Sequence, residues 1–204
     1  MANDLLAEKK PPLHQRVLRV LQFCRNFLEL VVIIGVLWWL AIPYYGDWLA
    51  RLSGGILSGV FGMPLAWATV EPAGVLNTLS YLQFGWSEEA GVMAGTTSDL
   101  PVALLVTNMA PYLALVLATP GLSLLRRLIV LAVGAFILFA GHVAFIVLAF
   151  YFREQIAKAP DLPSAVAQFY LTLPFVLWII LAYWGKIARY LTEDDAGTDT
   201  GTGA

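Results

Sequence analysis

The chain has 204 residues, of which 59% are hydrophobic and 13% are charged, and its formal net charge is −2. A soluble domain would carry about twice that charged fraction, so the composition indicates an integral membrane protein that forms one helical bundle. No basic stripe lies beyond the N-terminal leader, so no nucleic-acid partner is expected. The single cysteine, Cys24, excludes an intramolecular disulfide and a cysteine-held metal cluster.

Four apolar stretches predict an all-α integral membrane fold, a four-span helical bundle. They cover residues 27–45, 101–118, 128–152 and 165–184. Each can cross about 30 Å of hydrocarbon at about 1.5 Å per residue. Residues 1–26 form a cytoplasmic basic leader, whose part 14–26 is expected to extend the first helix as an amphipathic segment near lipid headgroups. The membrane domain covers 27–192, and the acidic tail 193–204 is expected to be disordered.

The basic residues predict the orientation of these spans. Nine of them flank one set of helix ends and three lie on the other side. Because cytoplasmic segments carry the excess of Lys and Arg, we expect both termini in the cytoplasm of a bacterial inner membrane. Arg126 and Arg127 then form a cytoplasmic basic turn between the second and third spans. At the opposite side, an outer aromatic belt is expected from Trp38, Trp39, Tyr44, Tyr45 and Trp48.

The outer segment 46–100 is too long for a simple loop and predicts a small extracytoplasmic subdomain. Its first part, residues 48–62, is apolar with regularly spaced small residues, which predicts a separate interfacial or re-entrant helix that ends before Pro64. The alternative is a loosely ordered glycine-rich loop. Residues 66–71 and 78–86 are rich in β-branched and aromatic residues and predict a pair of short strands.

Polar residues interrupt the last three spans. They are Thr107, Asn108, His142, Gln168 and Thr172. Such groups are costly in hydrocarbon and usually face the bundle interior. Asn108, His142 and Thr172 lie about 10–15 Å from the outer surface, counted along their helices. They predict either a polar pocket for a substrate or partner, or hydrogen bonds that only fasten the bundle. In both cases we expect Asn108 and His142 to face each other, directly or through water.

Pro111 and Pro174 add backbone acceptors to this layer. Proline has no N–H, so each leaves the carbonyl four residues earlier without its helical donor. The two freed carbonyls belong to Thr107 and Tyr170. Standard metalloprotease, phosphate-loop and serine-hydrolase signatures are missing. His142 is the one histidine within the spans, so no metal centre and no cofactor are expected.

Residues 48–152 resemble the core of the exosortase/archaeosortase family, polytopic membrane transpeptidases that process C-terminal sorting signals outside the cytoplasmic membrane. The resemblance lies in the order of parts: a glycine-rich segment, a short β-like region, a helix that opens where the family places its cysteine, and a basic turn. At the cysteine position this chain has Thr107 and Asn108. The family's Asn-x-x-Arg element has its nearest match at His142, with Phe145 at the arginine position, and Gln168 stands where the last polar catalytic residue is sought.

The resemblance therefore implies a catalytically degenerate, exosortase-associated membrane protein without thiol-dependent activity. Its partners would be membrane lipid and an exosortase or the sorting segment of its substrate. Two other classes remain open. One is a transporter or channel subunit lined by Asn108, His142 and Thr172. The other is a membrane transpeptidase or hydrolase with a non-cysteine site and His142 as the base.

Overall fold

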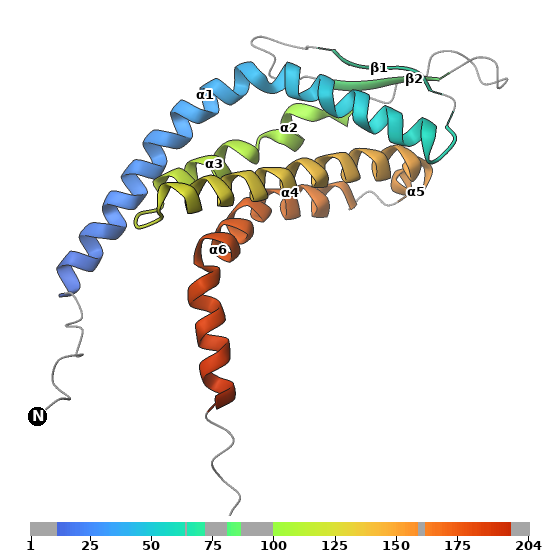
Figure 1. Ribbon diagram of the computed structural model, residues 1–204. Helices are drawn as coiled ribbons and strands as arrows, with labels where there is room; N and C mark the ends of the chain where they lie inside the picture. The colour runs from blue at the N-terminus through green and yellow to red at the C-terminus, as the bar shows by residue number, and fades with distance from the viewer. Residues whose placement is uncertain (1–11, 64, 72–80, 87–99, 159–161, 197–204) are drawn as a thin grey trace, which may run out of the picture.

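The computed structural model of the protein describes residues 12–63, 65–71, 81–86, 100–158 and 162–196 (Figure 1). Within these ranges the chain forms six α-helices and three short strands. Two of the helices, α1 (Leu13–Gly59) and α4 (Leu124–Tyr151), are long and apolar enough to cross a membrane. The described chain is thus mainly helical, and a small sheet lies beside one end of α1 (Figure 1).

Helix α1 is one continuous helix of 47 residues, about 70 Å long. The leader forms its first turns, as expected. The prediction of a separate interfacial or re-entrant helix over 48–62 is wrong, because this stretch continues α1 to Gly59. Glycine and serine cost helix stability in isolation, but here Ser53 and Gly54 lie on a buried face together with Leu49 and Leu57. Pro43 lies inside the helix, and α1 bends near its middle (Figure 1).

The sheet contains the expected strand pair. Strands β1 (Leu65–Glu71) and β2 (Tyr81–Trp86) are antiparallel, with Glu71 opposite Tyr81, so this prediction is confirmed. A third strand, β3 (Leu100–Pro101), adds to β2 and is too short to be recognised in the sequence. The residues predicted to begin the second strand, 78–80, lie outside the described residues. Leu65 and Ala68 pack against the buried face of α1, which holds the sheet on that helix.

The second predicted span is broken into α2 (Val102–Val106) and α3 (Met109–Ala118). The break falls at Thr107 and Asn108. Pro111 explains it, because this residue cannot donate to the Thr107 carbonyl and its ring crowds that oxygen. Pro111 itself is then in the first turn of α3, where a missing N–H costs little.

Two further helices complete the described chain, α5 (Arg153–Ala157) and α6 (Leu162–Ala196). Pro174 lies inside α6, and beyond it the helix turns away from α4 (Figure 1). The first four residues of the tail predicted to be disordered, 193–196, are helical, and residues 197–204 lie outside the described chain.

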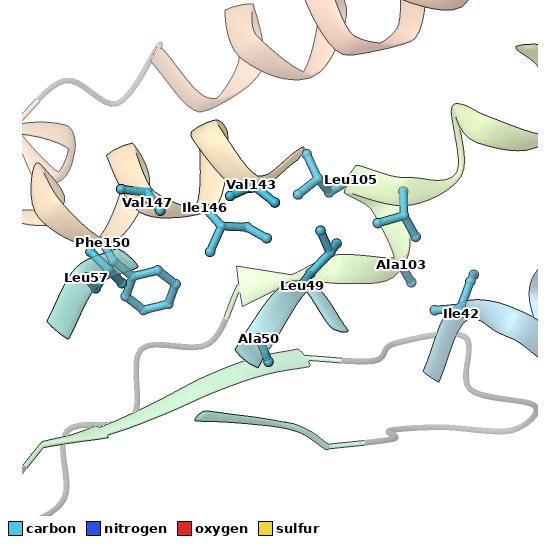
Figure 2. Close-up of a cluster of buried hydrophobic side chains, with 11 residues drawn as sticks. Ile42, Leu49, Ala50, Leu57, Ala103, Leu105, Val143, Ile146, Val147 and Phe150 are labelled. Carbon is cyan, nitrogen blue, oxygen red and sulfur yellow. The ribbon is translucent and has the colours of Figure 1, made fainter. Parts of the chain in front are cut away.

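Buried apolar side chains form two clusters along α4. The first joins the second half of α1 and α2 to α4, and it includes Leu49, Leu57, Ile146 and Phe150 (Figure 2). The second joins α3, α4 and α6 around Tyr112, Val116, Leu138 and Leu177. We call the end of the bundle near the first cluster the sheet end, and the end near residues 119–127 the basic-turn end.

Candidate functional site

The side chain of His142 lies between the two apolar clusters and is fully buried. Its Nδ1 atom is 2.9 Å from the hydroxyl of Tyr45 on α1. Its Nε2 atom is 3.0 Å from Oδ1 of Asn108, which precedes α3. The Asn108 amide nitrogen donates in turn to the carbonyl of Tyr170 on α6, at 3.3 Å. The expectation that Asn108 and His142 face each other is therefore confirmed, and their contact is direct.

The four groups form one chain of hydrogen bonds with a single direction, which we call the polar chain. Because the Asn108 amide nitrogen donates to a carbonyl, its Oδ1 faces the imidazole and accepts. His142 Nε2 must then carry the proton. In the neutral imidazole, Nδ1 is left as an acceptor for the Tyr45 hydroxyl. Neutral groups thus satisfy both ring nitrogens and both polar atoms of the Asn108 side chain.

Local backbone irregularities present these groups to one another. The break between α2 and α3 places Asn108 at the start of α3, one residue before the first helical position. It also exposes the Val106 carbonyl, which accepts a hydrogen bond of 3.0 Å from the Trp38 indole. On α6, Pro174 removes the helical donor for the Tyr170 carbonyl. The expectation that this freed acceptor lies in the polar layer is confirmed by its bond to Asn108.

Aromatic rings enclose the imidazole. Tyr45 contacts it edge-on, with ring centroids 5.9 Å apart, and Tyr170 stacks on it at 5.9 Å with an interplanar angle of 22°. The Tyr170 hydroxyl donates to the Gly141 carbonyl at 2.6 Å, which fixes that ring. Such aromatic contacts add about 0.5–1.5 kcal/mol per pair beyond the area that they bury. The histidine is thereby held in one position between α1 and α6.

The structure brings together two of the five polar residues that the sequence singled out. Asn108 and His142 meet, whereas the side chains of Thr107, Gln168 and Thr172 are exposed. The Thr172 hydroxyl bonds within its own helix, to the Phe169 carbonyl at 2.9 Å. The Thr107 hydroxyl donates to the Ala103 carbonyl of α2, at 2.6 Å. The three exposed residues therefore take no part in the polar chain.

Sequence reasoning missed the inward role of Tyr45 and the ring contact of Tyr170 with the imidazole. Tyr45 was assigned to the aromatic belt with Tyr44, but Tyr44 is exposed and Tyr45 turns inward. Tyr45 follows Ile42 by three residues and precedes Leu49 by four, so it lies on the same helix face as these two fully buried residues. This spacing of three and four residues is the signal that could have separated the two tyrosines. For Tyr170, Pro174 four residues later predicts the freed carbonyl but not the ring contact.

The chemistry available at His142 is limited by its surroundings. Cys24 is exposed near the start of α1, about 32 Å from Tyr45 along the helix. Both ring nitrogens already have partners. In the part of the chain that the structure describes, no three His, Cys, Asp or Glu side chains gather as metal ligands would. The arrangement is suited to fixing four chain segments relative to one another.

The predicted basic turn lies at the other end of α4. Arg126 donates through Nη2 to the Ala182 carbonyl of α6 at 3.2 Å. Arg127 donates through Nη2 to the Thr119 carbonyl at 2.9 Å. The two arginines therefore contact different neighbours, although they are adjacent in the sequence.

Comparison of the chain with known protein families, with characterised proteins and with solved structures finds no match.

Proposed function

We propose that this chain is a non-catalytic accessory protein of an exosortase-like sorting system, held in a bacterial inner membrane by four spans. Its role would be to assist a membrane transpeptidase in handling the sorting segment of its substrate outside the cytoplasm. The proposal has three supports. They are the bilayer position that the charged residues indicate, the order of segments along residues 48–152, and the residues at the position of the family's nucleophile.

Two exposed ion pairs on α1 support the bilayer position. Arg25 pairs with Glu29 at 3.7 Å, and Arg51 pairs with Asp47 at 2.8 Å. Charged pairs of this kind are not expected to face hydrocarbon. Between Glu29 and Asp47 lie 18 residue steps of helix, about 27 Å, which is close to the thickness of a hydrocarbon core. The exposed apolar side chains between them, such as Val32, Val36 and Leu40, would face lipid.

The same placement accommodates the remaining spans. Helix α4 would cross the bilayer as a single helix. Helices α2 and α3 together, over residues 102–118, would form a second crossing, and α6 would form the last of the four spans. The excess of basic residues favours a cytoplasmic basic-turn end. Both termini would then be cytoplasmic, and the sheet would lie outside the cytoplasm. The polar chain would lie near the outer boundary of the bilayer, because Tyr45 is only two residues before Asp47.

The single observation that carries the non-catalytic role is the state of Asn108. Together with Thr107, whose hydroxyl donates to the Ala103 carbonyl at 2.6 Å, this residue stands where the resemblance places a nucleophilic cysteine. Its amide nitrogen donates to the Tyr170 carbonyl and its oxygen faces His142, so both polar atoms are engaged in holding helices. A side chain bound in this way has no free atom for attack on a substrate. A fastening role at the former nucleophile position is what a degenerate member of such a family would retain.

The two other classes have less support. A transport path needs polar groups that line a route across the bilayer, whereas Asn108 and His142 are buried and bonded to neighbouring helices. Thr172, the third residue proposed for such a lining, is exposed and bonded within α6. A hydrolase with His142 as the base needs an acceptor nitrogen that faces a substrate or a water, whereas the acceptor nitrogen of His142 faces the Tyr45 hydroxyl and its other nitrogen donates to Asn108.

Gene deletion in the host bacterium tests the proposal. The processed fraction of a protein with a sorting signal is measured by immunoblotting in the wild type, in the deletion strain, and in strains complemented with this chain. We expect the deletion to lower processing while the transpeptidase is still present, and complementation to restore it. Unchanged processing in the deletion strain would contradict the accessory role. Processing by this purified chain alone would contradict its non-catalytic character.

A further inference from the structure

The two guanidinium groups at the basic-turn end have no acidic partner within the described residues. Arg25 and Arg51, by contrast, each pair with a carboxylate on α1. Arg126 and Arg127 each donate to one neutral backbone carbonyl, of Ala182 and of Thr119 respectively. Two adjacent positive charges are therefore held at one end of the bundle without compensation from the described chain.

Arg127 is held by a rigid junction. Helix α3 ends at Ala118, its C-cap residue Thr119 has a ψ of 118°, and Gly121 takes a φ of 79° that favours glycine. This tight turn returns the chain to Ser123, which caps α4 by accepting from the Arg126 amide. The Thr119 carbonyl is thereby brought within 2.9 Å of Arg127 Nη2. The Arg127 guanidinium is thus held beside the turn by its hydrogen bond to the Thr119 carbonyl.

Three helices fix the Thr119 side of this junction. The Thr119 hydroxyl is buried, donates to the Leu115 carbonyl at 2.6 Å, and accepts from the Trp178 indole at 2.7 Å. Trp178 on α6 stacks in turn on Phe23 of α1, with centroids 5.7 Å apart. The arginines therefore stand beside a junction that includes α1, α3, α4 and α6.

Hydrogen-bonding capacity at the arginines is left over. A guanidinium has five N–H donors, and each of the two arginines donates through Nη2 to one carbonyl. Nε of Arg127 is buried and out of reach of an external ligand, so the donors left for such a ligand are on the Nη atoms. A guanidinium without a carboxylate partner is stabilised when another group supplies negative charge nearby. Arg126 is exposed and bonds through Nη2 to Ala182, so its other donors can reach a group outside the chain.

We propose that Arg126 and Arg127 bind the phosphate of an anionic phospholipid in the cytoplasmic leaflet. The planar fork of a guanidinium matches phosphate oxygens, and the N-terminus of α4 adds a favourable dipole. Leu124, Leu125 and Leu128 are large, exposed and apolar around the same turn, as acyl chains beside a bound headgroup require. The inference rests on the proposed bilayer position and not on the sorting role.

Native mass spectrometry of the full-length protein in detergent tests this site, because it counts bound lipids on folded protein. Phosphatidylglycerol and phosphatidylcholine are added at equal concentrations, and the ratio of the two bound forms is measured. We expect the wild type to prefer phosphatidylglycerol. Each of Arg126→Gln and Arg127→Gln should lower that preference about fivefold. Arg51→Gln is the matched control, since it removes an arginine that is paired at the other end of α1.

The outcomes separate the possible sources of binding. A variant that carries both Arg126→Gln and Arg127→Gln completes the series. If it retained the wild-type preference for phosphatidylglycerol, the proposal would be overturned, and so it would be if Arg51→Gln lost that preference to the same extent. A parallel series with inorganic phosphate distinguishes a headgroup from a free anion. Suppression of phosphatidylglycerol binding by millimolar phosphate would assign the site to the soluble anion. Should Arg127→Gln fail to fold, Arg126→Gln alone decides, because that side chain is exposed and makes one long bond to Ala182.

Discussion

The polar chain and the basic turn lie at two positions along α4 and differ in how their polar groups are paired. His142 and Arg127 are 15 residue steps apart on this helix, about 22 Å. At His142, each polar atom of the imidazole and of the Asn108 side chain has a neutral hydrogen-bond partner. At the basic turn, two charged guanidinium groups donate to neutral carbonyls and have no carboxylate partner within the described residues. The first arrangement is closed, whereas the second is open to a further ligand.

The difference separates stabilisation from recognition within one helical bundle. A closed neutral chain has nothing to offer a substrate, so substitutions there should change the stability of the fold. An open cationic site has unmatched capacity, so substitutions there should change binding more than folding. The predictions below test this division and are ordered from the largest expected effect to the smallest.

The largest effect on stability is expected at Gly134, which lies between Arg127 and His142 on α4. A Cβ atom added here would lie 1.8 Å from the hydroxyl of Tyr112, a fully buried residue of α3. That hydroxyl also bonds to the Val130 carbonyl at 2.5 Å. Gly134→Ala should therefore lower the free energy of unfolding by about 2–4 kcal/mol, from overpacking and the displaced hydrogen bond.

Unfolding of the protein in mixed micelles measures this difference. Gly35→Ala on α1 is the matched control, because a Cβ there meets no atom within 4 Å. It should be neutral or slightly stabilising, since alanine favours helix over glycine. Equal effects of the two substitutions would show that α3 and α4 are not in the described contact.

The next effect concerns the centre of the polar chain. His142→Leu leaves the Tyr45 hydroxyl and the Asn108 oxygen without their partner. We expect a loss of about 1–3 kcal/mol in the free energy of unfolding, toward the lower value if the unfolded state in the membrane finds other partners. Gln168→Leu, at an exposed polar position of α6, should cost far less. A larger loss in the free energy of unfolding for Gln168→Leu than for His142→Leu would contradict the central place of His142 in the polar chain.

A smaller change is expected at the end of the chain. Tyr45→Phe removes one donor to the imidazole and leaves the ring contacts in place. It should cost about 0.5–1.5 kcal/mol, the net worth of one hydrogen bond. Tyr44→Phe is the matched control on the adjacent, exposed residue. The thermal midpoint of each variant in micelles measures the difference, and equal midpoints for the two variants would contradict the inward role of Tyr45.

The smallest effect is expected for Cys24→Ser. Cys24 is exposed on α1 and far from the polar chain. Its substitution should change the free energy of unfolding by less than about 0.5 kcal/mol and leave any cellular function intact. Loss of substrate processing in a complemented strain would show that this thiol takes part in the function, and would overturn the non-thiol interpretation.

Hydropathy and proline positions predicted much of this arrangement. The strand pair, the contact of Asn108 with His142, and the freed Tyr170 carbonyl are confirmed. These features depend on local spacing or on depth along a helix, which a sequence records directly.

The continuity of α1 was not predictable in the same way. Its glycines favour a break by local propensity, but Leu49, Leu57 and the neighbouring small residues pack against other elements. Tertiary contacts therefore overrode the local signal. The inward turn of Tyr45 was missed because neighbouring aromatic residues suggested a membrane belt, although its spacing of three and four residues from Ile42 and Leu49 places it on the buried face of α1.

The most direct test of the central claim combines folding and function in one variant, His142→Gln. A glutamine side chain offers one donor and one acceptor end, and so can replace part of the bonding to Tyr45 and Asn108 without supplying an imidazole. Substrate processing and the amount of folded protein are measured together in complemented deletion strains. The account predicts that processing follows the amount of folded His142→Gln protein, with as much processing per molecule of this chain as in the wild type. Normal protein levels with processing as low as in the deletion strain would contradict it.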